Sequence, residues 1–531
     1  MRKHVIITVI LLVATAYVTV IYFKNLSPPG KNTARVMAVI PDTAPIVFEF
    51  SNDNSFYDIF KGNTLFESVT GKQQFYELDT LRQQVLQNPL LDRYFGGEDI
   101  FISFYPVSHT GAEYLYTLSA INGFGPAVMD QLAKQGNSGL VITPLRIGGK
   151  QGYNVYISIL KKIFYLVNNE DNIYSGSFSK DLIAQSARYK PQKNKQSFVL
   201  LPDQQNANSL VNIYINYGQL DPLFNLFYSN KNTDIFKSFR LLPGLAALSL
   251  NYKTDALMFN GSTTVLKDKP LSYINLFVGQ RPVENHLKDI FPSTTAYGTS
   301  FSVSDPIKFT RDLAGWYNKA GLKSEEDQLF SNIQSETGIK IQKSFNALLG
   351  NEFAIITTRY FEKFALISVK DGSQMSTLLT NISKLISENS GQFSYDKLPF
   401  FLLGDAFSVF RHPYYLIIDN YLILANSAGE LKSYSDSYLN QKFLSKNTQY
   451  QQFDELLAAQ SNVSFLVIFK NSGEVFKRDM DAGYYDCFIN GDPGWKSFYG
   501  ASWQLTAADR NFYTNFCLKL PADSVKYSQE H

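Results

Sequence analysis

Cysteine is scarce in this 531-residue chain, which contains only Cys487 and Cys517. Two thiols exclude a disulfide framework, and they leave two alternatives: one bridge in an oxidising compartment, or two free buried cysteines. The 5 histidines are scattered without the spacing of zinc ligands, so we expect no metal site. The sequence also lacks a Gly-x-x-x-x-Gly-Lys-Ser/Thr phosphate loop and a Gly-x-Ser-x-Gly nucleophile turn. We therefore expect no cofactor and assign no catalytic residue.

Neither sign of charge is in excess. The 49 Lys plus Arg and 47 Asp plus Glu leave a formal net charge of +2. A protein that binds a polyphosphate backbone needs a broad basic field, which this composition does not supply. We therefore expect no nucleic-acid partner.

The chain is rich in flat side chains. Aromatic residues make up 15%, mainly from 42 Phe and 33 Tyr. Such side chains pair well across neighbouring strands, so the composition favours β-sheet. The length is too great for one ordinary core and suggests two large domains.

An uncharged apolar segment lies near the N-terminus. It spans the 19 residues 5–23 and follows a short tail at 1–4. A helix of this length can cross a bilayer core, so we predict a transmembrane signal-anchor helix at 5–23. A cleaved signal peptide, with Ala14-Thr15-Ala16 as its cleavage site, is the alternative and would leave a soluble periplasmic protein.

The orientation of this segment is argued from the size of its flanks. Basic residues occur on both sides, so the positive-inside rule gives little preference. The very short tail and the large C-terminal region favour an inner-membrane protein whose body lies in the periplasm. Residues 24–37 are then interpreted as a tether.

Short motifs recur along the chain at a nearly constant spacing. Ile40-Pro41-Asp42-Thr43-Ala44 is echoed by Phe291-Pro292-Ser293-Thr294-Thr295, and Phe95-Gly96-Gly97-Glu98 by Leu349-Gly350-Asn351-Glu352. Three further matches follow in the same order, and all offsets lie between 250 and 254: Phe164 with Tyr414, Val211 with Val463, and Leu248 with Ser502. We infer an internal duplication, with a first unit at 38–265, a connector at 266–289, a second unit at 290–520 and a disordered tail at 521–531.

Within each unit, hairpins outnumber plausible helical crossovers. We predict helix starts at Ser179, Asp305-Pro306 and Ser427, and the strongest helical spacing runs from Met375 to Ile386. A strand is expected at Phe407–Phe410. The predicted fold class is α+β: two tandem homologous units of largely antiparallel sheet with packed helices. A propeller-like all-β arrangement with inserted helices is the alternative.

Four carboxylates occupy repeated turn positions: Glu98, Glu352, Asp255 and Asp509. A glutamate that faces a cleft can act as a general acid or base. The same residue can instead close a turn by accepting hydrogen bonds from backbone N–H groups. We favour this structural role, because a shared fold requires it at both positions.

The segment from Gly483 to Trp495 is the richest candidate for a binding loop. Its candidate binding residues are Tyr484, Tyr485, Asp486, Asp492 and Trp495. Aromatic faces on a loop give contact area at low entropic cost. The alternative is a long hairpin connection whose aromatic side chains fold back onto the sheet.

The apolar leader, the motif at Ile40 to Thr43 with its echo at Phe291 to Thr294, and the two Gly-x-Glu turns together suggest a family. They resemble a Bacteroidota domain-of-unknown-function family of membrane-anchored, internally duplicated envelope proteins. The resemblance implies an architecture and a location, since the family has no assigned activity. We expect a non-catalytic binding or scaffolding module whose partner is an envelope protein or polymer. An envelope hydrolase with a dispersed carboxylate site, such as Glu352, is the alternative.

Overall fold

The computed structural model describes residues 35–52, 56–57, 64–89, 91–107, 111–121, 123–134, 139–170, 172–190, 209–228, 242, 244–266, 272–490 and 495–521. The predicted membrane segment at 5–23 and most of the predicted tether lie outside these residues. Within the described part of the chain, no helix is long and apolar enough to cross a bilayer.

The described strands fall into two sets of ten. The first half of the chain contributes β1 (Ile46–Ser51), β2 (Asp99–Val107), β3 (Gly111–Ser119), β4 (Leu140–Ile147), β5 (Lys150–Ile157), β6 (Lys162–Glu170), β7 (Ile173–Ser177), β8 (Val211–Asn216), β9 (Gly244–Lys253) and β10 (Ala256–Val265). The second half contributes β11 (Thr295–Ser302), β12 (Leu349–Thr358), β13 (Lys363–Val369), β14 (Ser383–Ser387), β15 (Ser390–Phe393), β16 (Tyr414–Ile418), β17 (Tyr421–Ala425), β18 (Val463–Ile468), β19 (Gly500–Ala508) and β20 (Asn511–Lys519).

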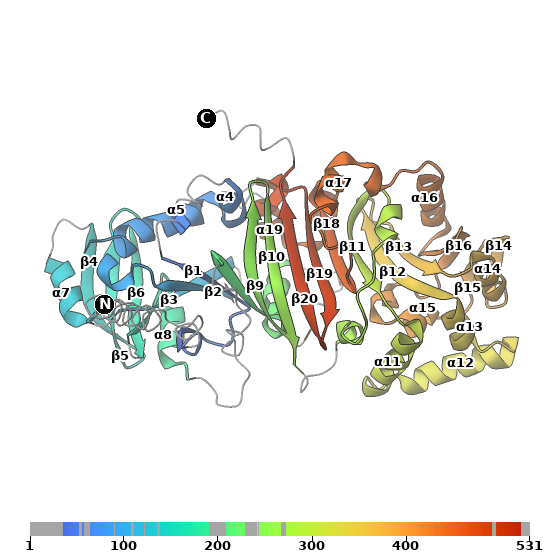
Figure 1. The fold of residues 1–531 in the computed structure, drawn as a ribbon, viewed down its shortest axis with the longest axis horizontal. Coiled ribbons are helices and arrows are strands. Elements are labelled where there is room, and N and C mark those ends of the chain that lie inside the picture. Colours follow the sequence, from blue (N-terminus) through green and yellow to red (C-terminus); the bar gives the residue numbers. More distant parts are fainter. Residues whose placement is uncertain are drawn as a thin grey trace, which may run out of the picture.

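All of these strands belong to one 20-stranded antiparallel sheet. The pairings give the order β4-β5-β6-β7-β3-β2-β1-β8-β9-β10-β20-β19-β18-β11-β12-β13-β17-β16-β15-β14. The sheet runs the length of the molecule, with the first half of the chain at one end and the second half at the other (Figure 1). The α+β class is therefore confirmed, and the propeller-like alternative is wrong because the strands form one continuous sheet.

The two halves of the chain use the same pairing scheme. β1 pairs with β2 and β8, as β11 pairs with β12 and β18, and the same correspondence holds for the remaining strands of each half. The turns before β1 and β11 also match. The Pro41 carbonyl accepts the Ala44 N–H at 3.2 Å, and the Pro292 carbonyl accepts the Thr295 N–H at 2.9 Å.

Helices connect the strands in both halves. In the first half they are α4 (Thr64–Thr70), α5 (Lys72–Leu81), the π-helical turn η1 (Arg82–Leu86), α6 (Asp92–Phe95), α7 (Pro126–Lys134), α8 (Lys180–Arg188), η4 (Tyr217–Gln219) and α9 (Leu220–Phe227). The second half and the connector contain η5 (Tyr273–Phe277), η6 (Leu287–Ile290), α11 (Pro306–Lys319), α12 (Lys323–Thr337), α13 (Ile341–Leu348), α14 (Gly372–Thr380), α15 (Leu398–Leu403), η7 (Asp405–Val409), α16 (Ala428–Leu439), η8 (Leu444–Lys446), α17 (Thr448–Asp454), α18 (Phe469–Asp479), α19 (Ala482–Asn490) and η9 (Trp495–Ser497).

The predicted helix starts are confirmed by their caps. The Ser179 hydroxyl accepts the Leu182 N–H, and Ser427 forms a reciprocal capping box with Glu430. Asp305 accepts the Lys308 N–H at 2.9 Å, and Pro306 follows it at the first turn of α11. These contacts satisfy backbone donors that a helix leaves unpaired at its N-terminus.

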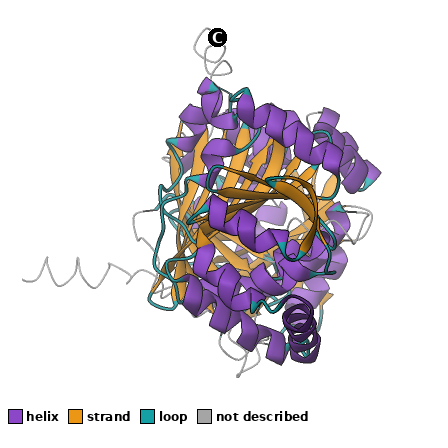
Figure 2. Ribbon diagram, turned by 90° about the vertical axis from the view of Figure 1, so that its right-hand side faces the viewer, coloured by secondary structure: helices purple, strands orange, loops and turns teal. Residues whose placement is uncertain are grey.

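Helices pack on both sides of the sheet (Figure 2). One face carries α8 in the first half and α16 with α17 in the second, over two separate apolar clusters. We call it the α8/α16 face. The opposite face carries α7 in a cluster of the first half, and α9, α11, α14 and α18 over one large core that spans both halves.

Two predicted elements differ from the structure. The helical spacing from Met375 to Ile386 ends at Thr380, because Ser383–Ser387 forms the strand β14, which pairs with β15. Leu385 and Ile386 are exposed, so they do not belong to the buried face of a helix, although their spacing suggests one. Phe407–Phe410 forms no strand, since residues 405–409 make the turn η7, and Phe407 and Phe410 are buried in the large core.

The connector and the tether are shorter than their predicted ranges. Residues 273–277 of the connector form η5, and Phe277 stacks on Phe301 with ring centroids 5.2 Å apart inside the large core. Val36 and Met37, placed in the tether, are buried in the first unit with Ile147 and Val167. Most of the predicted tail, residues 522–531, lies outside the described residues.

Candidate functional site

A row of polar side chains crosses the middle of the α8/α16 face. In strand order it consists of Glu49 on β1, Asn212 on β8, Ser249 on β9, Asn260 on β10, Asn515 on β20, Gln504 on β19, Ser464 on β18 and Ser300 on β11. Each residue is directly opposite the next in the strand pairing. With about 4.8 Å between strands, this polar row spans roughly 34 Å.

A pseudo-twofold axis passes through the centre of the polar row. Lys253 pairs with Ala256 at the tip of one hairpin and Ala508 with Asn511 at the other, so Asn260 and Asn515 hold equivalent positions. These two residues are also opposite each other between β10 and β20. An antiparallel pair of equivalent residues places the axis between them. The axis therefore relates Ser249 to Gln504, Asn212 to Ser464 and Glu49 to Ser300.

The first-half arm of the polar row is closed by its own hydrogen bonds. Glu49, with 5% of its surface exposed, accepts the Tyr214 hydroxyl at 2.6 Å and the Asn212 side-chain amide at 3.0 Å. Ser249 donates to the Asn212 side-chain oxygen at 2.8 Å. Burial, together with the Glu49 charge, raises the pKa of Tyr214 far above its usual range, so this hydroxyl stays a donor. This arm is structural.

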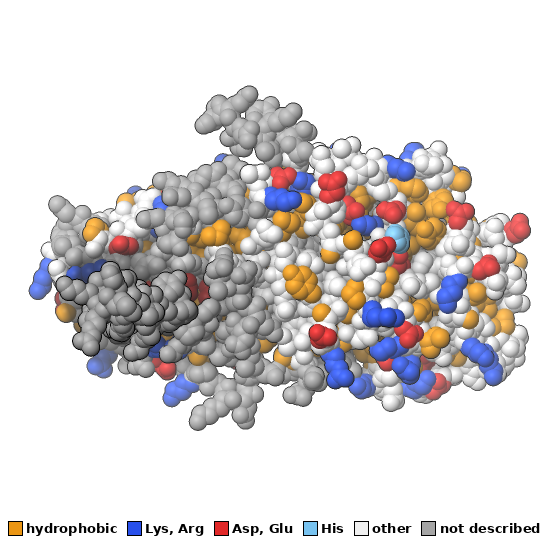
Figure 3. Space-filling model, in the orientation of Figure 1, with side chains coloured by type: hydrophobic (Ala, Val, Ile, Leu, Met, Phe, Trp, Pro, Cys, Tyr) orange, Lys and Arg blue, Asp and Glu red, His pale blue; other side chains and the backbone are white. Residues whose placement is uncertain are grey.

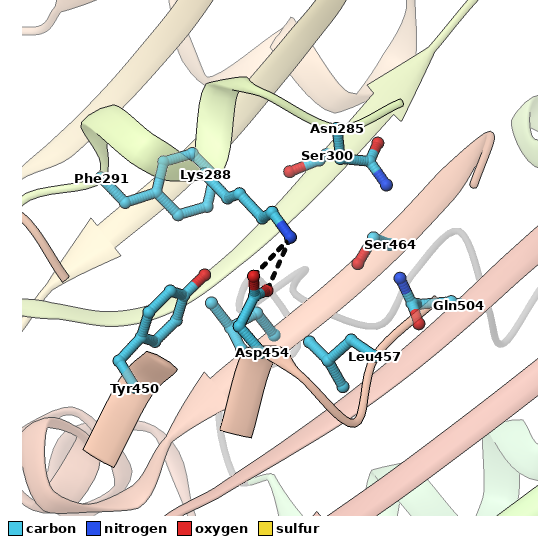
Figure 4. A pocket seen from close by; sticks show the side chains of 10 residues that line it. Asn285, Lys288, Phe291, Ser300, Tyr450, Asp454, Leu457, Ser464 and Gln504 are labelled. Carbon is cyan, nitrogen blue, oxygen red and sulfur yellow. Dashed lines mark hydrogen bonds and ion pairs between the residues drawn. The ribbon is translucent and has the colours of Figure 1, made fainter. Parts of the chain in front are cut away.

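In the second-half arm, Gln504 is held by the backbone and lies beside an ion pair. The Gln504 side chain accepts the Ala458 N–H at 2.8 Å and donates to the Ala458 carbonyl at 2.9 Å. Beside it, the Lys288 ammonium contacts both carboxylate oxygens of Asp454 at 2.7 Å (Figure 4). The cavity among these residues measures about 20 Å³, which is room for about one water molecule. No substrate-sized ligand fits there.

The centre of the polar row offers unpaired hydrogen-bonding groups. Asn260 and Asn515 are half-buried, and in the described part of the chain neither side-chain amide has a hydrogen-bond partner. On the same face, their neighbours Met258 and Tyr513 hold equivalent positions about the axis, and Tyr513 is 45% exposed. Each amide supplies two donors and one acceptor oxygen. The centre therefore combines two amides, a thioether and a phenol ring.

Few charges surround this centre. In the space-filling view, the uncovered surface over the central strands is mostly uncharged (Figure 3). Lys519 and Asp255, near one end of β10 and β20, form an ion pair with each other. An uncharged surface with amides suits a partner that presents neutral polar groups, because it provides no counter-charge.

The repeated turn carboxylates lie away from this centre. Glu98 accepts the Ser119 hydroxyl at 2.7 Å, and Asp509 is exposed in the two-residue turn between β19 and β20. The strand pairing also shows which carboxylates hold equivalent positions in the two halves. Ser51 is opposite Asp99 and Ser302 is opposite Glu352, so Asp99 is the strand counterpart of Glu352.

Glu352 fastens the connector to the sheet. Its side chain, 8% exposed, accepts the His286 N–H at 2.8 Å and the Leu287 N–H at 2.9 Å, at the start of η6. Burial raises the pKa of Glu352, although the two backbone N–H groups oppose that shift. Glu352 lines neither of the two best-formed cavities in the described residues. The arrangement supports the structural role that we favoured.

The segment predicted as a binding loop contains a helix instead. Residues 482–490 form α19, and Phe488 is buried against Phe476 with ring centroids 5.2 Å apart. Tyr484 packs edge-on against Phe227 at 4.8 Å, and Asp486 is exposed. The aromatic spacing arises because α19 packs on α18. Asp492 and the side chain of Trp495 lie outside the described residues.

Neither metal nor disulfide chemistry marks this surface. No cluster of three metal-ligating side chains occurs in the part of the chain that the structure describes. Cys517 is a free buried thiol on β20, opposite Met258, and burial raises its pKa to about 12. The side chain of Cys487 is not among the described residues.

The polar row was not found from the sequence. Its residues are Asn, Ser and Gln at alternate strand positions, which is the ordinary pattern of a solvated strand face. The signal appears only when the register aligns eight strands. Comparison with known proteins found no matching family model, no matching curated protein and no matching solved structure.

Proposed function

We propose that this chain is a non-catalytic, membrane-anchored envelope protein that binds a partner on the α8/α16 face, around the axis between β10 and β20. One observation carries the proposal. Asn260 and Asn515 present half-buried amides without a hydrogen-bond partner among the described residues at the centre of the polar row, whereas Glu49, Asn212 and Ser249 on one side and Gln504 on the other are held by internal hydrogen bonds. Both amides are half-buried and not fully enclosed, so their donors and acceptors stay accessible to a partner.

The partner that this surface favours is an envelope protein or polymer that presents neutral hydrogen-bonding groups. The chain carries a net charge of only +2, and the centre of the face has no charged side chain of its own. Binding would therefore depend weakly on salt, unlike binding to a polyanion. Tyr513 adds an exposed aromatic ring for stacking.

The location follows from the sequence. We propose that residues 5–23 anchor the chain in the inner membrane and that the body faces the periplasm. Digestion by an added protease in cells whose outer membrane alone is permeabilised, but not in intact cells, would support this location. Release of a soluble, shortened chain would support the cleaved-signal alternative.

The two halves are proposed to descend from one duplicated unit. Support comes from their common pairing scheme and from the equivalence of Asn260 and Asn515 about the axis. Duplication explains why the same residue type occurs on both sides of the binding centre.

A photo-crosslinking side chain at position 515 tests the binding face. Full-length tagged protein carrying it should capture a partner in its own membranes, whereas the same side chain at Asn318, an exposed position on α11, should not. In the double variant N260A/N515A, capture from a crosslinker at Tyr513 should fall strongly. Because neither amide has an internal partner, the double variant should fold normally.

The proposal fails on either of two results. Equal capture from positions 515 and 318 would show that contact is nonspecific. Unchanged capture by a correctly folded N260A/N515A protein would show that the amides do not take part. A partner whose capture disappears at moderate salt would indicate charge-driven binding elsewhere on the molecule.

A further inference from the structure

An apolar tip lies at the outer end of the first unit. Val141 on β4, Tyr156 on β5 and Ile163 on β6 are directly opposite one another in the strand pairing. Their exposed fractions are 56%, 38% and 40%, and Ile159 in the β5–β6 turn is 54% exposed. These four residues form what we call the apolar tip. Contiguous exposure of large apolar side chains marks a surface that another phase or molecule covers.

The apolar tip is exposed because α8 packs on the other end of these strands. Leu145 on β4 and Tyr165 on β6 share the side of the sheet that bears the tip, and they pack against the cluster that contains α8. That cluster covers the other end of the three strands, at Ile147 and Val167. The α8 cluster does not extend over Val141, Tyr156 and Ile163, so these side chains stay exposed at this end of the strands.

The chain leaves the described structure close to the same strands. Arg35 is the first described residue, and Val36 and Met37 pack in one cluster with Ile147 on β4. Val141 lies six residues before Ile147, a distance of about 20 Å along the strand at 3.3 Å per residue. The eleven residues 24–34 can span at most about 40 Å. The apolar tip is therefore within reach of a bilayer that holds residues 5–23.

The chemistry of the turn beside the tip suits a lipid headgroup region. Lys161 is exposed there, and Lys162 binds Glu77 at 2.5 Å. Aliphatic and aromatic side chains flanked by lysine are the composition of surfaces that enter the headgroup and acyl boundary. Anionic lipids attract exposed lysines such as Lys161.

We propose that the apolar tip rests in the membrane surface next to the N-terminal anchor and orients the first unit on the bilayer. This inference rests on the anchor of the proposed function but not on the binding face. The tip would give a second, shallow contact, which fixes the angle of the body relative to the membrane. The proposed binding centre between β10 and β20 lies several strands away along the sheet, on the same face as the tip.

The opposite end of the sheet supplies a matched control. Leu385 and Ile386 on β14 are 53% and 59% exposed, comparable with the tip residues. β14 is the counterpart of β4 in the second half, and nineteen strand spacings separate them, about 90 Å along the sheet. It has similar apolar exposure but no neighbouring membrane segment.

The test is lipid photolabelling of the full-length protein. The chain is reconstituted in vesicles of phosphatidylethanolamine and phosphatidylglycerol that contain a phosphatidylcholine with a diazirine in its acyl chain. After illumination, peptides are mapped for lipid adducts. We expect adducts on residues 5–23 and on the strands that carry Val141, Tyr156 and Ile163. The variant V141D/I163D should lose tip adducts at least about fivefold, whereas L385D/I386D should keep them.

The outcomes separate the inference from the anchor. Adducts on residues 5–23 without adducts on the tip overturn the inference and leave the anchor standing. Adducts on the tip without any on residues 5–23 overturn the anchor and retain the lipid contact. Crosslinks between two copies through β4, in place of lipid adducts, would show that a second copy covers the tip and would overturn the inference.

Discussion

Replacing Glu352 tests whether this carboxylate acts as a structural clamp. One side-chain oxygen accepts both the His286 and the Leu287 N–H groups. In E352A both donors lose their acceptor. The glutamine of E352Q keeps one carbonyl oxygen at the same position, so it can accept both bonds while carrying no charge. The pair of variants separates hydrogen bonding from ionisation.

The size of the effect follows from burial. Leu287 is buried, so its N–H cannot turn to water, whereas His286 is exposed and its N–H can. E352A should therefore leave mainly one buried donor unsatisfied, at a cost of about 1–3 kcal/mol. E352Q should lie within about 1 kcal/mol of the natural protein, because its weaker acceptor is offset by the removal of a buried charge.

Native-state hydrogen exchange measures the local free-energy cost of losing the Glu352 acceptor. The Leu287 amide should exchange roughly 10- to 100-fold faster in E352A, since 1.4 kcal/mol of local opening free energy corresponds to tenfold. Amides of β4, far from the clamp, serve as the internal control. Exchange of the Leu287 amide at the natural rate in E352A, or equally fast exchange in E352Q and E352A, would show that Glu352 is not a hydrogen-bonding clamp.

The pH dependence of the same pair has a defined sign. Burial raises the folded-state pKa of Glu352 above the value of about 4.3 in an unfolded chain. The folded state then binds more protons than the unfolded state between the two pKa values. Stability from this group is fully present below pH 4 and falls as pH rises through that window. E352Q lacks this loss, so its stability relative to the natural protein should improve from pH 4 upwards.

Three further predictions concern the core, the thiol and the ion pair. F353A should lower the free energy of unfolding by about 3–5 kcal/mol and F353L by about 1 kcal/mol, measured by urea denaturation, because Phe353 is fully buried among Phe277, Phe301, Phe309 and Phe407. Cys517, with a pKa of about 12, should resist iodoacetamide at pH 8 until urea unfolds the protein, and rapid labelling of folded protein would contradict its burial. K288M should destabilise the protein by about 1–2 kcal/mol by leaving Asp454 unpaired, and K288M/D454L should recover most of that loss in thermal melts.

Local sequence signals predicted the elements that depend on local contacts. The helix starts at Ser179, Asp305 and Ser427 were predicted because a cap needs only a side chain and a backbone donor three residues later. The predominance of hairpins was predicted for a similar reason: short connections make antiparallel neighbours, as between β2 and β3 and between β5 and β6.

The misassigned elements are those that distant contacts decide. Ser383–Ser387 has helical spacing with the residues before it, yet it pairs as β14 with β15. Phe407 and Phe410 belong to the turn η7 because the large core receives both rings. The α19 segment resembles a loop in composition, but packing of Phe488 against Phe476 favours a helix. In each case, a partner remote in sequence overrode the local preference.

The juxtaposition of Asn260 and Asn515 also depends on distant contacts, so the sequence does not predict it. Asn260 and Asn515 are 255 residues apart (515 minus 260), and nothing in either strand distinguishes them from other solvated asparagines. Their juxtaposition requires both the register of each hairpin and the pairing of β10 with β20. The recurring motifs match Leu248 with Ser502 at an offset of 254. In the structure, equivalent residues of the two hairpins, such as Asn260 and Asn515, are 255 residues apart.

The surroundings of equivalent residues differ between the centre of the polar row and its arms. Far from the axis, equivalent residues have different surroundings, so each half has closed its arm differently: Glu49 binds Asn212 in one, and Gln504 binds the Ala458 backbone in the other. At the axis, each asparagine has as its counterpart a copy of itself on the opposing strand. An amide carries both donors and an acceptor, so two facing asparagines are able to bond to each other. No such hydrogen bond joins Asn260 and Asn515 in the described structure. Both amides are therefore available to the partner that we propose, and capture from position 515 tests that availability directly.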